Sequence, residues 1–191
     1  LALGSVPTAY LLGRWLGGID IRGRGNRNPG ALNAYRQLGK AAGAAVLLVD
    51  AGKGALAIFI GRTLETPDAA LYGAGVVAIV GHNFSPFLRF RGGKGAATAL
   101  GISAIMLWQI TAVTVAAGAL LFMVTRHPVW SLTGVFVLLN ALTIATSQPA
   151  GQIAVCLAIS AVVGGTHFYR QRDQLLPALR QRRWRRFMSI E

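Results

Sequence analysis

The sequence predicts an all-α integral membrane protein, a bundle of seven transmembrane helices with its N-terminus outside the cell and its C-terminus in the cytoplasm. Three observations support this fold class. The 191 residues are 53% hydrophobic, with a mean hydropathy of +0.51. Only six Lys, Arg, Asp or Glu residues lie between Arg62 and Arg170, and long apolar runs separate them. The net charge of +13 gathers at the ends of these runs, as in proteins that span a bilayer.

This composition argues against several other classes of protein. A soluble enzyme does not combine so many apolar residues with so few charges, and a disordered chain lacks long apolar runs. A scaffold held by intrachain disulfides is excluded, because Cys156 is the only cysteine. The chain is therefore expected to cross a membrane several times.

The expected helices follow the apolar segments in order. These segments cover residues 1–16, 41–60, 69–88, 95–124, 131–146 and 151–168. The run over residues 95–124 is too long for one upright span and short for two. A turn near Trp108 and Gln109 divides it into two short spans and places about 17 of the 19 basic residues on one face of the membrane. A single long helix would put Arg126 and the C-terminal tail on the other face, so the positive-inside rule favours seven spans.

The chain is expected to divide into a membrane domain, residues 1–169, and a basic cytoplasmic tail, residues 170–191. The tail contains seven Arg residues, five of them between Arg180 and Arg186 around Trp184. Basic clusters beside a membrane span attract anionic lipid head groups, so anionic lipid is the expected partner of the tail. Nucleic acid is the other ligand that such a cluster can bind, and the membrane context argues against it.

Two loops expected on the positively charged side differ in composition from ordinary connectors. They span residues 20–36 and 81–95, and each combines glycines with Asn and Lys or Arg. Glycine lets backbone N–H groups converge on an anion, and Lys and Arg supply the opposite charge. Residues 92–95 (Gly-Gly-Lys-Gly) open directly into an expected helix, which is typical of a phosphate site at a helix start. The alternative is that both loops hold turn glycines and topology-setting charges.

Single polar residues in or beside the apolar segments leave alternatives open. Asp50 and Lys53 lie inside the second segment, and their spacing of three puts them on one helix face. They form either a neutralising ion pair or a pair that organises the anion site. His82, at the end of the third segment, is either a hydrogen-bonded structural residue or part of the site. Ser131 is either the N-cap of its helix or a hydroxyl that contacts an anion.

The sequence predicts no metal ion and no cofactor. No set of His, Cys, Asp or Glu residues has the spacing of metal ligands. The Rossmann, Walker and GxSxG patterns are absent as well. His167, near the end of the last apolar segment, is expected to be structural.

Several stretches of the chain match one set of sequence patterns. The first pattern, GSGNxGATN, corresponds to residues 25–33, which read Gly-Asn-Arg-Asn-Pro-Gly-Ala-Leu-Asn here. Arg36 follows, and then Leu-Gly-Lys at residues 38–40. D-x-x-K-G is found at residues 50–54, and GHxFSPFLxFxGGKGxAT is matched throughout residues 81–98. In these motifs the sequence resembles the bacterial acyl-phosphate:glycerol-3-phosphate acyltransferases of the PlsY type.

The resemblance implies a seven-helix enzyme of the bacterial inner membrane, with its site on the cytoplasmic side. Such enzymes transfer an acyl chain from acyl phosphate to the 1-hydroxyl of glycerol 3-phosphate, which gives lysophosphatidic acid for phospholipid biosynthesis. Both substrates carry a phosphate, which explains the need for two anion sites. The implied catalytic residues are Arg36, Lys94 and Ser131. The implied phosphate-binding residues are Gly25, Asn28, Gly30, Asn33, His82, Gly92, Gly93 and Gly95.

The chain also departs from the family pattern where the site is expected. The departures are Asn26, Arg27, Leu32, Gln171 and Gln174, which stand in place of Ser, Gly, Thr, His and Asn. They define the alternative function, a catalytically impaired family member that serves as a structural or accessory subunit of a membrane protein complex. The complete match over residues 81–98 favours the active enzyme. A transporter is a third and weaker hypothesis, because the chain has a single intramembrane charge pair.

Overall fold

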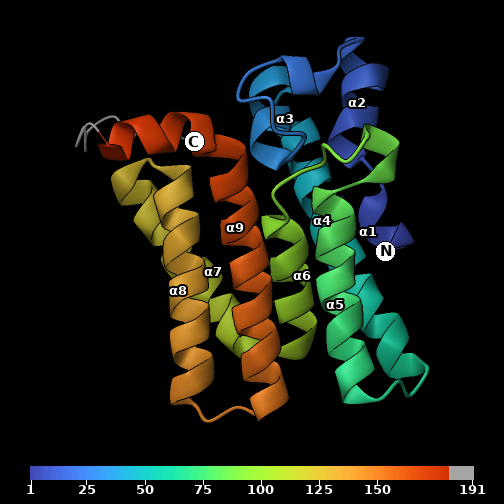
Figure 1. The fold of residues 1–191 in the computed structure, drawn as a ribbon, viewed down its shortest axis with the longest axis vertical. Coiled ribbons are helices and arrows are strands. Elements are labelled where there is room, and N and C mark those ends of the chain that lie inside the picture. Colours follow the sequence, from blue (N-terminus) through green and yellow to red (C-terminus); the bar gives the residue numbers. More distant parts are fainter. Residues whose placement is uncertain (181–191) are drawn as a thin grey trace.

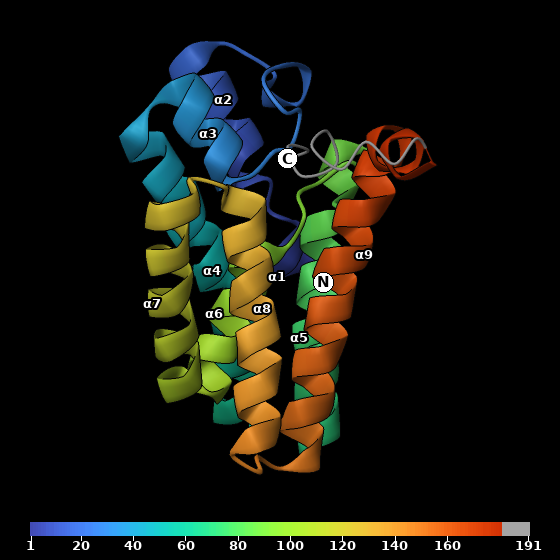
Figure 2. The same cartoon turned by 90° about the vertical axis from the view of Figure 1, so that its left-hand side faces the viewer.

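The computed structural model describes residues 1–180, and every regular element in that range is helical (Figure 1). The elements are α1 (Ala2–Ser5), α2 (Thr8–Gly17), η1 (Ile21–Gly23), α3 (Ala31–Leu38), α4 (Lys40–Thr63), α5 (Asp68–Asn83), η2 (Pro86–Leu88), α6 (Ala96–Met106), α7 (Trp108–Thr125), α8 (Pro128–Ala145) and α9 (Ala150–Arg180). Helices α4 to α9 form an up-and-down bundle, and α2 and α3 lie over one end of it (Figures 1 and 2). The all-α prediction is confirmed.

Five helices among residues 1–180 are long and apolar enough to cross a membrane: α4, α5, α7, α8 and α9. Helix α6 is apolar too but has only 11 residues. The prediction of several membrane-spanning helices is therefore confirmed at this level. The count of seven spans and the orientation of the termini stay predictions.

The long apolar run over residues 95–124 forms two helices, as the charge distribution predicts. Helix α6 ends at Met106, Leu107 adopts φ −141° and ψ 55°, and α7 begins at Trp108. Because the chain reverses there, the connections after α2, α5 and α7 lie at the same end of the bundle as α3, and those after α4, α6 and α8 lie at the other end (Figure 1). The two polar loops therefore share one end of the molecule.

The first apolar segment is a broken helix, which corrects the single span expected over residues 1–16. Helix α1 ends at Ser5, α2 begins at Thr8, and Val6 and Pro7 lie between them. Proline has no N–H and disfavours helical geometry in the residue before it, and Val6 has a ψ of 119°. The break turns the Val6 carbonyl and the Thr8 hydroxyl toward buried charges on α4.

Two other elements also differ from the prediction. Part of the loop expected over residues 20–36 is helix α3, which begins after an extended Gly30. Helix α9 continues to Arg180, so the predicted domain boundary at residues 169 and 170 is not marked by a helix end. The helix bends at the upper end of the bundle, and its last turns run across it (Figures 1 and 2). The rest of the arginine-rich cluster, residues 181–186, lies outside the described residues.

The core lies between five of the helices. Its fully buried isoleucine and leucine side chains come from α4, α5, α6, α8 and α9, and they are Ile58, Ile79, Ile102, Leu139 and Ile159. Helix α7 packs mainly on α8 and leaves large apolar side chains exposed, among them Leu120, Met123 and Val124. Such exposure is expected of a helix that faces lipid, where apolar side chains meet apolar tails.

Candidate active site

A cavity of about 510 Å³ opens at the end of the bundle that holds the two polar loops. Its mouth is polar and is lined by Asn26, Asn28, Asp50, His82, Lys94 and His167. Its body is apolar and lies between α6, α8 and α9, where it is lined by Leu100, Leu132, Phe136, Val137 and Val163. The cavity therefore combines a charged head region with an apolar groove, a shape suited to an amphiphilic ligand.

The Gly-Gly-Lys-Gly segment reaches the mouth through Lys94 and Gly95. Gly95 has φ +82°, a left-handed geometry that favours glycine, and α6 starts directly after it as predicted. Lys94 and Gly95 both line the cavity. The segment thus places one positive charge at the point where the polar mouth meets the apolar groove.

The N–H groups of Gly92 and Gly93 have a different role from the one expected. Gly92 donates to the Asn83 carbonyl at 3.1 Å, and Gly93 donates to the His82 carbonyl at 3.1 Å. These acceptors are carbonyls left without partners at the C-terminal end of α5. The two N–H groups therefore cap α5, and the phosphate contact expected of Gly92 and Gly93 stays a prediction. A Cβ at either position would overlap His82, so the glycines let the segment pack against that residue.

The loop before α3 is held together by Asn33, which was expected to bind phosphate. Asn33 is fully buried, and its amide donates to the carbonyls of Ile21 at 3.1 Å and Arg24 at 3.0 Å. Gly25, at φ +56°, packs on the same side chain, and neither residue lines the cavity. Both residues fix the shape of the loop, and the phosphate contacts expected of them stay predictions.

Other residues of this loop do line the mouth of the cavity. They are Asn26, Asn28, Gly30 and Leu32. Asn26 accepts a hydrogen bond from the Asn28 N–H at 3.1 Å, and Asn28 Oδ1 is buried with no hydrogen-bond partner. Asn26 was counted as a departure from the family pattern. Its side chain nevertheless places an amide at the mouth, where a polar group is needed.

Asp50 is the centre of a buried polar cluster beside the mouth. Its carboxylate pairs with Lys53 Nζ at 2.8 Å, and both side chains are almost fully buried. Thr8 Oγ1 donates to Asp50 at 3.1 Å, and Lys53 Nζ also donates to the Val6 carbonyl at 3.0 Å. His82 Nδ1 lies 3.8 Å from Asp50 Oδ1. The predicted ion pair is thus present, and it fixes the break between α1 and α2 against α4.

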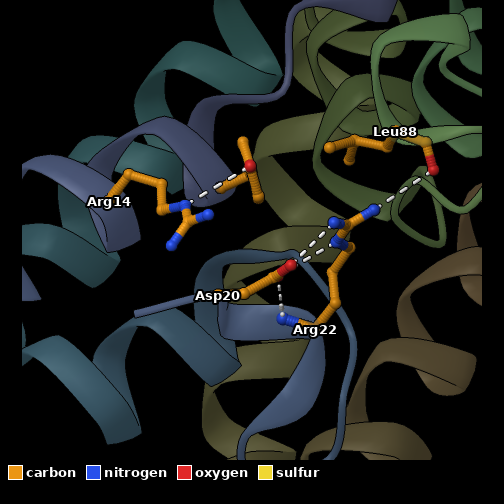
Figure 3. A network of polar contacts seen from close by, with 5 residues as sticks. Arg14, Asp20, Arg22 and Leu88 are labelled. Carbon is orange, nitrogen blue, oxygen red and sulfur yellow. Dashed lines mark hydrogen bonds and ion pairs between the residues drawn. The ribbon is translucent and has the colours of Figure 1, made fainter. Parts of the chain in front are cut away.

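Arg22 joins the two loops that form the mouth (Figure 3). Its guanidinium donates to Asp20 from Nε at 3.0 Å and from Nη2 at 2.6 Å, and Nη1 donates to the Leu88 carbonyl at 3.3 Å. It also lies over the Tyr10 ring, 4.9 Å from the centroid, and Arg14 donates to the hydroxyl of that ring. The hydrogen bonds from Arg22 hold the pKa of Asp20 below its usual range. The network connects η1 to η2 and so positions one loop against the other.

Two predicted catalytic residues, Arg36 and Ser131, are not among the residues that line the cavity. Arg36 is exposed on α3 and is absent from the cavity lining. Ser131 lies one turn inside α8, which starts at Pro128, so it is not the helix N-cap. Its hydroxyl donates to the His127 carbonyl at 2.8 Å and does not line the cavity. The catalytic role expected of Arg36 and Ser131 stays a prediction.

Sequence reasoning overlooked several residues that shape the mouth. Asn83 donates to Thr166 Oγ1 at 2.8 Å, and its carbonyl accepts from Arg170 Nη2 at 2.7 Å as well as from the Gly92 N–H. Asn83 thereby ties α5 and the second loop to α9. His167, expected to be structural, lines the cavity opposite Lys94. Asn83 lies in the stretch 81–98 but stands at an unspecified position of the family pattern, so the pattern did not single it out.

Replacing Arg27 by glycine is expected to raise the free energy of unfolding by about 0.5–1 kcal/mol. Arg27 has φ +59°, a left-handed geometry that costs an L-residue about 1–2 kcal/mol. Glycine adopts it without that penalty but loses about 0.5–1 kcal/mol more backbone entropy on folding. Unfolding of the two proteins in mixed detergent micelles measures the difference.

Arg24→Gly is the matched control for this substitution. It removes the same charge from the same loop, but Arg24 has φ −123°, which any residue adopts. The control is expected to lower the free energy of unfolding by about 0.5–1 kcal/mol, through backbone entropy alone. Equal changes in the two variants would show that charge, and not backbone geometry, determines the effect at residue 27.

The fold and the cavity define a multi-pass membrane protein in which a polar mouth continues into an apolar groove. Residues 1–178 match the family described as glycerol-3-phosphate acyltransferase, and the chain belongs to that family. A glycerol-3-phosphate acyltransferase of Synechococcus sp. (strain JA-2-3B'a(2-13)) is 41% identical over 165 residues, covering 86% of this chain and 82% of the relative. Glycerol-3-phosphate acyltransferase 4 of Dehalococcoides mccartyi is 37% identical over 174 residues, covering 91% and 94%.

Two solved structures share the fold over most of the chain. Both are of PlsY (YgiH), an integral membrane glycerol 3-phosphate acyltransferase. The glycerol 3-phosphate form has a TM-score of 0.82 and 26% identity, covering 94% of this chain and 88% of that one. The lysophosphatidic acid form has a TM-score of 0.80 and 25% identity over the same shares. The predicted family is confirmed.

Proposed function

We propose that this protein transfers an acyl chain from acyl phosphate to the 1-hydroxyl of glycerol 3-phosphate and releases lysophosphatidic acid for phospholipid biosynthesis. The observation that supports this function is the cavity, in which a polar mouth containing Lys94 continues into an apolar groove. Lysophosphatidic acid, the proposed product, is divided in the same way into a polar phosphate head and an apolar acyl tail. The relatives and the solved structures named as glycerol-3-phosphate acyltransferases support the same substrate.

The proposed reaction needs no covalent enzyme intermediate. Acyl phosphate is an activated mixed anhydride, so the hydroxyl oxygen of glycerol 3-phosphate attacks the acyl carbon directly. The bond from that carbon to the phosphate oxygen breaks, the hydroxyl proton passes to the departing phosphate, and inorganic phosphate leaves. The protein contributes by holding the hydroxyl over the face of the acyl carbonyl and by stabilising negative charge on the acyl oxygen and the leaving group.

We assign this charge stabilisation to Lys94, because it lies where the mouth meets the groove. Asn26, Asn28 and Gly30 form the opposite wall of the mouth and are proposed to bind a substrate phosphate, with His82 beside them. Arg36 and Ser131 do not line the cavity, and their catalytic role beside Lys94 stays a proposal. The acyl chain occupies the groove between α6, α8 and α9.

We further propose that the chain forms seven spans in the bacterial inner membrane, with its N-terminus outside and its mouth facing the cytoplasm. The shared end of the basic loops supports this orientation, because basic loops are retained on the cytoplasmic side. On this side the mouth would meet water-soluble glycerol 3-phosphate. The segment from residue 170 onward would contact anionic lipid.

Purified protein in detergent is expected to release lysophosphatidic acid from palmitoyl phosphate and glycerol 3-phosphate, and Lys94→Ala is expected to lower kcat/KM about 100-fold. The reason is the loss of one fixed charge aimed at a developing anion. Product formation is measured with radiolabelled glycerol 3-phosphate.

Arg62→Ala is the matched control, because it removes a basic side chain at the opposite end of the bundle. Its guanidinium donates to the Ile105 carbonyl. Arg62 is near the last residue of α4 and Ile105 is near the last residue of α6, and both helices end on the side of the bundle away from the mouth. This variant is expected to keep wild-type activity. A folded wild-type protein that produces no lysophosphatidic acid would refute the proposed function and favour the accessory-subunit alternative.

A further inference from the structure

The deep end of the apolar groove holds a polar bridge between α8 and α9. Asn140 Nδ2 donates to Ser160 Oγ at 2.8 Å and to the Phe136 carbonyl at 2.7 Å. Asn140 and Ser160 both line the cavity. The remaining amide oxygen, Asn140 Oδ1, is buried and accepts no hydrogen bond. A hydrogen-bonded polar pair, whose unused acceptor lies below the surface, therefore marks the deep end of an otherwise apolar groove.

The position of the bridge follows from the helices that line the cavity. On α8 the lining residues run from Pro128 at the mouth to Asn140, which is about 18 Å along the axis at 1.5 Å per residue. On α9, which runs in the opposite direction, they run from Ser160 to His167, and His167 lies at the mouth. Asn140 and Ser160 are therefore the lining residues farthest from the mouth on their two helices.

The side chains between the bridge and the mouth are different in character. Leu132, Phe136, Val137 and Val163 are apolar, and they surround a chain with contacts that favour each added methylene. Thr133 carries the one other hydroxyl among the α8 residues that line the cavity, and this hydroxyl donates to the Val129 carbonyl. An acyl chain thus meets an apolar wall until it reaches Asn140, where further methylenes would have to separate the hydrogen bond between Asn140 and Ser160.

We propose that the Asn140–Ser160 bridge limits how deeply an acyl chain enters the groove and thereby sets the chain-length preference of the enzyme. This inference rests on the proposed function, because it takes the groove as the acyl-chain site. Chains that end before the bridge bind entirely against apolar side chains. Longer chains either break the hydrogen bond between Asn140 and Ser160 or leave the groove for the lipid, and they gain nothing from their extra methylenes.

The test measures binding of two alkyl phosphates, dodecyl phosphate and octadecyl phosphate, to the protein in nanodiscs by calorimetry. Asn140→Leu replaces the amide with an apolar side chain of similar size. It is expected to increase the affinity for octadecyl phosphate relative to dodecyl phosphate about tenfold over the wild-type ratio, which corresponds to ~1.4 kcal/mol. Asn140→Ala, which cannot overpack the groove, is expected to shift the ratio in the same direction and serves if the leucine variant does not fold.

Thr146→Leu is the matched control, since Thr146 lies at the end of the same helix, is exposed and does not line the cavity. Its ratio of the affinities for octadecyl and dodecyl phosphate is expected to equal that of the wild type. The comparison thereby corrects for partition of the two probes into the lipid of the nanodisc. An unchanged ratio in both folded Asn140 variants would overturn the inference. Alkyl phosphate binding that shifts as expected in a protein without acyl transfer would instead refute the proposed function alone.

Discussion

Replacing Lys53 by methionine is expected to lower the free energy of unfolding by about 3–5 kcal/mol, because it leaves Asp50 buried without its ionic partner. The two side chains are only 6% and 3% exposed, and their charged atoms lie 2.8 Å apart. Thr8 remains as a neutral donor to Asp50, but it does not replace a full charge. The variant also loses the hydrogen bond from Lys53 to the Val6 carbonyl at the break between α1 and α2. Unfolding with sodium dodecyl sulfate in mixed micelles measures the loss.

The double variant Asp50→Leu/Lys53→Met separates the two interpretations of this pair. Apolar residues of similar size often replace a buried ion pair without loss of stability, so most of the stability lost in Lys53→Met is expected to return. If the double variant is stable and keeps acyl transfer, the pair only neutralises itself and fixes the helix break. If it is stable and inactive, Asp50 contributes to the mouth that it lines with His82. Wild-type stability of Lys53→Met alone would contradict both interpretations.

The arrangement of the helices was accessible from the sequence because hydropathy and charge determine it locally. The turn at Leu107 is an example, since neither helix on its own has a distinctive signal and the charge of Arg126 decides the case. The pairing of Asp50 with Lys53 was accessible for the same reason, because a spacing of three defines one helix face. Pro7 also gave a local signal for the break, which the apolar character of residues 1–16 obscured.

The roles of individual site residues depend on contacts between distant segments, which a single sequence does not reveal. Gly92 and Gly93 have the composition of an anion loop, yet their N–H groups are taken by the end of α5, an element that only the folded chain brings alongside. The side-chain amide of Asn33 likewise donates its hydrogen bonds to carbonyls of its own loop. Asn140 and Ser160 are single polar residues in apolar helices, and their meeting in the groove depends on how α8 packs against α9.

Replacing Gly101 by leucine is the second substitution expected to have a large effect, with a loss of about 3 kcal/mol or more in the free energy of unfolding. A Cβ on Gly101 would overlap the backbone carbonyl oxygen of Ala51, and a Cβ on Gly54 would overlap that of Thr98. Helices α4 and α6 therefore cross with their backbones in direct contact, as small residues permit in membranes. Backbone atoms cannot rotate away as a side chain does, so the two helices must separate.

Gly52→Leu is the matched control, because it places the same side chain on α4 where a Cβ meets no atom within 4 Å. Glycine inside a helix is about 1 kcal/mol less favourable than alanine, and leucine is close to alanine, so this control is expected to stabilise the protein slightly. Asp50 belongs to α4 and Lys94 directly precedes α6, and both line the mouth of the cavity. Separation of the two helices therefore also moves Asp50 and Lys94 apart. Gly101→Leu is therefore expected to lower acyl transfer even at temperatures where it stays folded. Equal stability of the two leucine variants would show that α4 and α6 do not depend on this close approach.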